Sequence, residues 1–450
     1  MRRGVIHAGV VDTLIRGGTV VTCDGADRVV DGDVRIRNGT IVSVGPALAA
    51  GTLTRVIDAR GCAVMPGLVQ AHVHLCQVLF RGMADDLKLL DWLRRRIWPL
   101  EAAHDEASVG ASAELGLVEA MLGGTTTILD MGTVRAHDAV MDACVRSGIR
   151  ALSGKAMMDR GEGVPAGLRE STRASLDESE RLASAWRGAG GGRVGYAWAP
   201  RFVLSCSEEL VRGTVERAAA HGEIVHTHAA EHPAEREAVR AAHGREDVAV
   251  LRDWGVWGPR AVLAHGVQLE IDEARAMARE GTRVVHCPSA NLKLGSGIAR
   301  VAELDGLGVK LALGADGAPC NNNLDAWTEL RHAALLAKVR TGVTTLPARR
   351  ALRLATIDGA RALGLDDRIG SVEPGKRADL AVVRLDGAHV EPGGDVFSRL
   401  VYACGARDVA HVLVDGEVVV RDREHQRLDV ARVKARARDQ ARRLVARAQI

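Results

Sequence analysis

The sequence has few aromatic residues and no long apolar run. Only 3% of its 450 residues are Phe, Tyr or Trp, so we expect a core packed mostly with Ala, Val and Leu. No stretch approaches the roughly 18 uninterrupted apolar residues that indicate a membrane-spanning helix. The opening MRRGVIHAGVVDTLIRGG carries arginines but no long apolar segment, so we expect no signal peptide.

Charge imbalance and paired cysteines are also lacking. The formal net charge is +3, too small for its sign to indicate a nucleic-acid or membrane partner. Eight cysteines are scattered without a CxxC pair, which predicts reduced thiols in a cytoplasmic protein without a disulfide framework. Apolar residues at 47% and charged residues at 26% are typical of a globular chain.

The two ends of the chain differ from its middle in their sequence pattern. Short strand-like segments with Gly and Asp-Gly breaks fill the first 66 residues and return in ADLAVVRL and VAHVLVDGEVVVRD. Between them, short apolar runs alternate with helical patterns about eight times. This predicts an α/β fold, a (β/α)8 TIM-type barrel with a small β-sandwich domain formed from both termini. We place the sandwich at 1–66 and 371–430, and the barrel at 67–370.

The last twenty residues, ARVKARARDQARRLVARAQI, form a basic helical pattern. A solvated terminal helix over 431–450 is the favoured interpretation, and binding to nucleic acid or membrane is the alternative.

Two histidine pairs stand on predicted strands. His72 and His74 follow an apolar run in PGLVQAHVHL, and His226 and His228 stand in EIVHTHAAE with Glu231 three residues later. Residues i and i+2 of a strand point to one face, so each pair of imidazoles projects together. Imidazole nitrogen is a good ligand for Zn or Fe, although a single H-x-H also occurs by chance or in hydrogen-bonding roles.

Two further polar residues end apolar runs. His265 closes AVLAH, and Asp316 follows VKLALGA, where burial of a carboxylate is costly unless it is paired or metal-bound. Each of these elements lies at the carboxyl end of a predicted barrel strand, where barrel enzymes place their catalytic groups. Together they predict a metal-dependent hydrolase.

Several motifs in order resemble the amidohydrolase superfamily, specifically its mononuclear deaminase branch, over almost the whole chain. They are PGLVQAHVH, GGTTTILDM, HTHAAE, LAHGV, HCPSANLKLGSG, GADGAPCNNNLDA and, in the returning β-domain, IGSVEPGKRADLAVV and VLVDGEVV.

The resemblance implies site residues and a cofactor. It assigns the metal ligands His72, His74, His228 and Asp316. It makes Glu231 the residue that shuttles protons and His265 the residue that orients the attacking water, whereas His226 is not a ligand. The binuclear branch uses a carboxylated Lys on strand four, but RVGYAWAPR has none and Lys155 lies a strand earlier, so one divalent metal ion is favoured, Zn before Fe. The family also implies a homo-oligomer.

The implied reaction is hydrolytic deamination. Water activated at the metal gives its proton to Asp316 and attacks an sp2 carbon that bears an amino group. Glu231 protonates the neighbouring ring nitrogen, and ammonia leaves.

Three residues bear on the substrate, a small aminated heterocycle or nucleoside of the purine type. Glu101 matches the residue that holds ribose hydroxyls in the S-adenosylhomocysteine/methylthioadenosine deaminases, but guanine deaminases share it. Gln77 and Arg201 resemble base-reading residues of guanine deaminase. ADGAPCNNNLD resembles the deoxyadenosine and adenosylhomocysteine group instead. We therefore place a 5′-modified adenosine first, guanine second and an s-triazine chlorohydrolase or deaminase third. A non-catalytic scaffold is the alternative from another class, and loop or ion-pair roles for Gln77 and Arg201 stay open.

Overall fold

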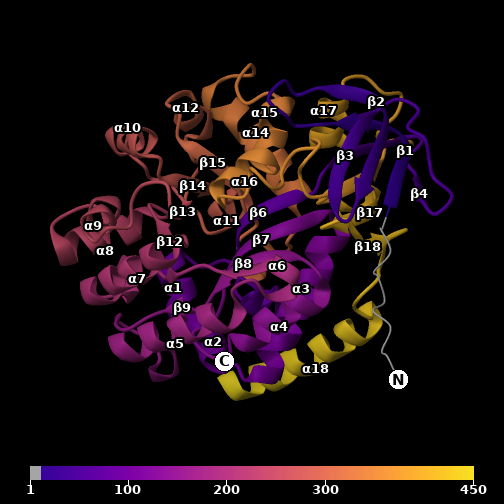
Figure 1. Cartoon of the computed structure of the whole chain (residues 1–450). Coiled ribbons are helices and arrows are strands. Elements are labelled where there is room, and N and C mark those ends of the chain that lie inside the picture. Colours follow the sequence, from indigo (N-terminus) through magenta and orange to yellow (C-terminus); the bar gives the residue numbers. More distant parts are fainter. Residues whose placement is uncertain (1–11) are drawn as a thin grey trace, which may run out of the picture.

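The computed structural model describes residues 12–450. It divides into a parallel barrel and a sheet built from both ends of the chain (Figure 1). The prediction of no signal peptide concerns the first residues of the chain, and residues 1–11 lie outside the described range. No helix in the described part of the chain combines the length and the apolar character needed to cross a membrane.

Nine strands from the two ends form one connected sheet. The N-terminal strands are β1 (Asp12–Val21), β2 (Val29–Arg37), β3 (Thr40–Gly45), β4 (Arg55–Asp58) and β5 (Cys62–Pro66). The C-terminal strands are β16 (Leu380–Arg384), β17 (Val409–Val414), β18 (Glu417–Arg421) and β19 (Glu424–His425). The order is β19-β18-β17-β16-β5-β1-β2-β3, with β4 paired to β1. Antiparallel pairing of β5 with β16 joins the two ends, and the strands pack around their own apolar cluster.

The barrel consists of two four-stranded parallel sheets. They contain β6 (Leu68–Val73), β7 (Thr125–Met131), β8 (Arg150–Gly154) and β10 (Val194–Tyr196), then β12 (Val225–Ala229), β13 (Ala261–His265), β14 (Arg283–His286) and β15 (Lys310–Leu313). Parallel bridges from Trp198 to Val225 and from Val73 to Asp316 join the sheets on both sides. The predicted barrel is thereby confirmed, while the four predicted domain ranges stay predictions.

Two strands that the sequence presents as continuous are interrupted. RALSGKAMM divides into β8 and β9 (Ala156–Met157), and the next strand divides into β10 and β11 (Ala199–Pro200). At Gly154 a Cβ atom would lie 1.7 Å from the carbonyl oxygen of Ala197, so only glycine permits this approach of the two strands. The break follows from backbone packing, which composition does not reveal.

Helices cover the outside of the barrel and form the loops above it. In the first half they are η1 (Leu75–Phe80), α1 (Leu89–Trp92), η2 (Leu93–Ile97), α2 (Trp98–Ala102), α3 (Glu106–Leu122), α4 (Asp138–Ser147), η3 (Ala166–Leu168), α5 (Thr172–Trp186), α6 (Ala189–Gly192), η4 (Val203–Ser205) and α7 (Glu208–His221). Sequence signals fix their ends. For example, the Ser207 hydroxyl accepts the Leu210 N–H at the start of α7, and Gly222 ends it with φ of 68°.

The second half continues the same alternation. Its helices are α8 (Pro233–His243), α9 (Asp247–Asp253), α10 (Ile271–Glu280), α11 (Pro288–Lys293), α12 (Val301–Gly306), α13 (Ala318–Asn321), α14 (Ala326–Thr341), α15 (Ala348–Leu354), α16 (Ile357–Ala362), α17 (Val396–Ser398), η5 (Arg399–Ala403), η6 (Ala406–Asp408) and α18 (Val430–Ala448). The basic C-terminal segment is α18, which lies along α3 and α2 (Figure 1).

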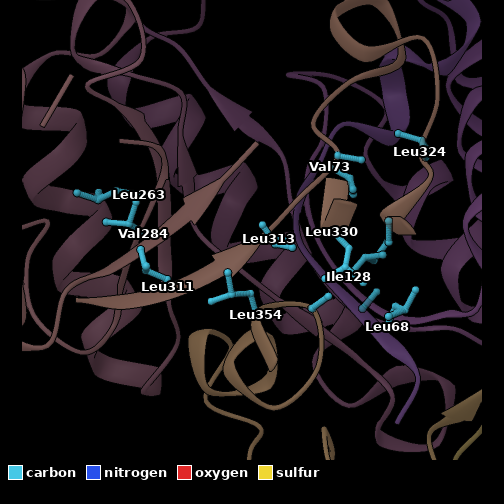
Figure 2. Close-up of a cluster of buried hydrophobic side chains, with 14 of the residues drawn as sticks. Leu68, Val73, Ile128, Leu263, Val284, Leu311, Leu313, Leu324, Leu330 and Leu354 are labelled. Carbon is cyan, nitrogen blue, oxygen red and sulfur yellow. The ribbon is translucent and has the colours of Figure 1, made fainter. Parts of the chain in front are cut away.

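Aliphatic side chains fill the space between strands and helices. Figure 2 shows a part of this core in which Leu68 and Ile128 lie near Leu330, while Leu263 lies beside Val284. Ala, Val and Leu dominate the buried residues, as their abundance and the scarcity of aromatic residues predict. Among the fully buried side chains of residues 12–450, the largest is Trp198.

A buried ion pair connects the barrel to the end sheet. Arg150 at the start of β8 donates from Nε and Nη2 to the two carboxylate oxygens of Asp379 at 2.7 and 3.0 Å, and both side chains are at most 3% exposed. Asp379 directly precedes β16 and also accepts the Asp415 N–H. Its position makes it the main counter-charge for a guanidinium that water does not reach.

Replacement of Asp379 by Ala is expected to lower the free energy of unfolding by about 3–5 kcal/mol, because it leaves the Arg150 charge buried with only a longer contact to Asp415. Chemical denaturation measures the change. The matched control is Asp58→Ala, which removes an exposed partner of Arg60 and should leave the unfolding midpoint almost unchanged. Equal stability of the two variants would contradict the prediction.

Candidate active site

Five polar side chains meet at the carboxyl ends of four barrel strands. They are His72 of β6, His74 directly after it, His228 of β12, His265 at the end of β13, and Asp316 after β15. The Oδ1 atom of Asp316 lies 3.3 Å from Nε2 of both His72 and His74, and the Nε2 atoms of His74 and His228 are 3.2 Å apart. The structure therefore brings together all the predicted metal ligands.

The backbone is strained at two of these positions. His265 has φ of 78° and Asp316 has φ of 62°, in the left-handed region that costs a residue with a Cβ atom about 1–2 kcal/mol. The Asp316 N–H donates to the carbonyl oxygen of His72 at 3.1 Å, which ties the strained turn to β6. Such strain is concentrated at functional sites, where the surrounding structure holds it in place.

In each of the four histidines, the Nδ1 atom is engaged by a neighbouring group. It lies 2.7 Å from the carbonyl oxygen of Met131 in His74, 2.7 Å from that of Arg201 in His228, and 2.9 Å from Asn291 Oδ1 in His265. In His72 it contacts Nε2 of His226 at 2.8 Å. A carbonyl oxygen only accepts, so it holds the proton on Nδ1 and leaves a lone pair on Nε2.

This donor set fits a divalent metal ion. His72, His228, His265 and Asp316 each offer one ligand atom, all within 4.8 Å of one another. His72 Nε2 is buried and has no hydrogen-bond partner among the described residues, as expected for an atom reserved for a cation. His74, the third predicted imidazole ligand, also directs Nε2 toward Asp316. Nitrogen donors with one carboxylate suit Zn and Fe.

Electrostatics differ between the two carboxylates of the site. Burial, reinforced by the charge of Asp316, raises the pKa of Glu231 well above its usual value. Burial alone would raise the pKa of Asp316 too, but the imidazoles of His72 and His74 beside its carboxylate lower it well below the usual range. One carboxylate therefore favours its proton and the other favours its charge, as proton transfer in two directions requires. Between them His265 Nε2 lies 3.5 Å from Glu231 and 3.9 Å from Asp316.

Lys155 lies away from this centre. Its ammonium pairs with Glu170 at 2.5 Å and contacts the Ser175 hydroxyl at 3.2 Å, under α5. The lysine that the sequence left as a possible bridge between two metals is thus engaged elsewhere.

The three residues proposed for substrate recognition form one buried network. Gln77 donates from Nε2 to Glu101 Oε1 at 2.8 Å, and Arg201 donates from Nη1 to Oε2 at 2.5 Å and from Nη2 to Oε1 at 3.3 Å. They come from η1, α2 and the segment after β11, and all three are at most 4% exposed. Gln77 Oε1 has no hydrogen-bond partner within residues 12–450, so the network keeps an acceptor free beside the metal ligands.

A cleft with about 380 Å³ of free space opens between this network and the metal ligands. Its lining includes residues that the sequence did not single out, namely Leu89, Trp92, Leu93, Phe202 and Leu294. Leu89, Trp92 and Leu93 have the i, i+3, i+4 spacing of one helical face, a pattern that could have marked them as apolar lining. Asn291, which holds His265, was missed because nothing local distinguishes it from a capping residue.

Gly317 leaves room for the Gln77 amide. A Cβ atom there would lie 2.1 Å from Gln77 Oε1. We expect Gly317→Ala to move that amide and break its contact with Glu101, which raises KM severalfold and leaves the melting temperature little changed, because the displaced group is the end of a flexible side chain. Steady-state kinetics test this against Gly306→Ala, where a new Cβ meets only open space. Identical KM values in both variants would disprove the steric role of Gly317.

The sequence matches the amidohydrolase family model over residues 63–419. The chain belongs to the amidohydrolase family. It is 41% identical to 5-methylthioadenosine/S-adenosylhomocysteine deaminase of Halobacterium salinarum over 443 residues, which cover 97% of this chain and 99% of that protein. It is 38% identical to 5′-deoxyadenosine deaminase of Methanosarcina acetivorans over 98% of this chain and 100% of that one.

A crystal structure in the same family extends the likeness to three dimensions. An adenosine deaminase from Xanthomonas campestris with bound zinc superimposes with a TM-score of 0.92 and 34% identity, covering 97% of this chain and 99% of that chain. These similarities confirm the predicted fold and the predicted enzyme class, a metal-dependent hydrolytic deaminase, rather than a non-catalytic scaffold.

Proposed function

We propose that this deaminase acts on an adenosine modified at the 5′ position, such as 5′-deoxyadenosine, methylthioadenosine or S-adenosylhomocysteine. The observation that carries the proposal is the cleft itself, whose lining places Gln77 and Arg201, the two partners of Glu101, beside the predicted proton donor Glu231. A carboxylate can accept two ribose hydroxyls, and the free Gln77 Oε1 can accept from the base or sugar.

The apolar lining supports one order among these substrates. Leu89, Trp92, Leu93, Phe202 and Leu294 suit a methyl or methylthio group. Of the described residues that line the cleft, Arg201 is the only Lys or Arg, and it is paired with Glu101. S-adenosylhomocysteine, with a charged amino-acid end, should therefore be the poorest of the three.

We assign the metal to His72, His74, His228 and Asp316, with His265 as the group that orients water. A divalent ion held there, Zn before Fe, would lower the pKa of water toward neutrality. Asp316 accepts a proton from the attacking water, and Glu231 donates one to the ring nitrogen next to the reacting carbon. Asp316 then gives its proton to the amino group, which leaves as ammonia, and the new hydroxyl group becomes a carbonyl as its proton returns to Glu231.

Guanine is the second candidate, favoured by one specific observation. Arg201 neutralises Glu101, and a neutralised pair reads a purine edge as readily as a ribose. An s-triazine is the third candidate.

Ammonia release across a panel tests the order. The panel contains adenosine, 5′-deoxyadenosine, methylthioadenosine, S-adenosylhomocysteine, guanine, cytosine and melamine. We expect kcat/KM for 5′-deoxyadenosine and for methylthioadenosine to exceed that for guanine by at least about tenfold, which corresponds to about 1.4 kcal/mol of activation free energy. Guanine turnover without nucleoside turnover would overturn the proposal. Arg201→His adds a second test, because guanine activity should collapse if Arg201 reads the base.

Compartment and assembly are proposals as well. The eight cysteines are unpaired, seven of them buried, which suits the reducing cytoplasm. The family resemblance implies a homo-oligomer, which light scattering on the purified protein would measure.

A further inference from the structure

The basic C-terminal helix α18 lies against the segment that carries the substrate-recognition residues. Its apolar face inserts Ala437 and Leu444 into the same cluster as Trp92, Trp98 and Leu100. Both inserted residues are at most 3% exposed. A terminal helix that was simply exposed to solvent would not bury its apolar face beside residues that line the cleft.

Arg447, near the end of α18, makes three polar contacts with one short stretch. Its Nε donates to the carbonyl oxygen of Ala103 at 2.8 Å, Nη1 pairs with Asp105 Oδ2 at 3.0 Å, and Nη2 donates to the Ser108 hydroxyl at 3.1 Å. This stretch joins the end of α2 to the capped start of α3. Ala103 is two residues from Glu101, so the guanidinium fixes the backbone just beyond the recognition carboxylate.

His104 extends these contacts to the second recognition residue. Its Nε2 donates to the carbonyl oxygen of Cys76 at 2.8 Å, and its Nδ1 accepts from the Ser108 hydroxyl at 2.9 Å. Burial lowers the pKa of His104 to about 4, so the ring is neutral and provides one donor and one acceptor. Cys76 precedes Gln77. The contacts of Arg447 and His104 thus connect the backbones next to Gln77 and Glu101, whose side chains are hydrogen-bonded to each other.

Two other arginines of α18 face solvent. Arg442 and Arg443 are 79% and 65% exposed, and each pairs with Asp439 of the same helix. A third arginine, Arg436, binds α3 instead, through Glu114 at 3.1 Å and the carbonyl oxygen of Ala107 at 3.3 Å. Arg447 is therefore distinguished by its contact with Ala103 in the substrate-binding segment.

We propose that α18 fixes the position of the substrate-binding segment 75–104 and that Arg447 is a positioning residue for Glu101. The proposal rests on the proposed function in one respect, that Glu101 contacts the substrate. It gives the C-terminal helix a part in substrate affinity rather than in binding nucleic acid or membrane.

The test compares Arg447→Ala with the matched control Arg442→Ala in the full-length, metal-loaded enzyme. For the best substrate of the panel, we expect Arg447→Ala to raise KM roughly three- to tenfold with kcat within about twofold, because ground-state positioning is lost while the reacting groups are unchanged. The KM of Arg447→Lys should lie between those of the wild type and Arg447→Ala, since one ammonium group can replace only part of the three contacts of the guanidinium. Arg442→Ala should match the wild type.

Hydrogen–deuterium exchange gives a readout independent of turnover. Amides of residues 75–104 should exchange faster in Arg447→Ala than in Arg442→Ala, with exchange at the barrel strands unchanged. Equal exchange and equal KM in the two variants would overturn the role of Arg447. Faster exchange in an enzyme that turns over no nucleoside would uphold the positioning role and refute the proposed substrate instead.

Discussion

Glu231→Gln is expected to lower kcat about 10²- to 10⁴-fold, the range typical of losing a general acid–base. The amide has the shape of the acid but cannot give up a proton to the ring nitrogen. Glu231 is only 5% exposed and its N–H is held by Glu235 Oε2 at 3.1 Å, so the backbone should keep its place. Stopped assays of ammonia release on the best substrate measure the loss.

The control for this variant lies on the next helix. Glu237 is exposed on α8, six residues along the chain, and Glu237→Gln makes the same chemical change without reaching the cleft. It should keep wild-type kcat. A kcat for Glu231→Gln within tenfold of the wild type would mean that another group supplies the proton.

Removal of the metal is the second change with a large expected effect. Chelation should abolish deamination and lower the melting temperature, because an ion that binds only the folded chain stabilises it, by about 2.7 kcal/mol at a hundredfold excess over Kd. Added Zn²⁺ or Fe²⁺ should restore both. Activity that survives exhaustive chelation would refute a metal-dependent reaction.

Two variants test whether His74 or His265 is a metal ligand. We expect His74→Ala to lose most of the bound metal and His265→Ala to keep about one equivalent while turning over at least about a hundredfold more slowly. Elemental analysis of the purified variants measures this directly. If His265→Ala loses the metal and His74→Ala keeps it, the ligands are the tighter group of His72, His228, His265 and Asp316.

The meeting of the proposed metal and proton-transfer groups was predictable because each lies at or just after the end of a barrel strand. His265 and Asp316 stand where a hydrophobic run stops, and in a parallel barrel all such points meet at one rim. The strand period also placed His72 and His74 on one face. Local pattern and topology therefore predict that these side chains gather at one rim, whereas their roles come from the family resemblance and stay predictions.

The recognition residues could not be arranged from sequence alone. Glu101 and Arg201 are a hundred positions apart, and nothing in the sequence around either residue shows that they form an ion pair with each other. The choice between contacting substrate and pairing internally depends on the three-dimensional approach of α2 to β11. The interruption at Lys155 escaped prediction likewise, since it depends on a backbone contact between two strands.

The pairing of β5 with β16 has a consequence for how this chain is made. More than 300 residues separate the end of β5 at Pro66 from the start of β16 at Leu380. During synthesis the N-terminal strands leave the ribosome long before their partner exists, and the edge of β5 stays unpaired throughout. Closure of so long a loop is slow, and exposed edges favour aggregation. The yield of active enzyme should therefore depend on chaperones and on low temperature more strongly than the stability of the folded enzyme would suggest.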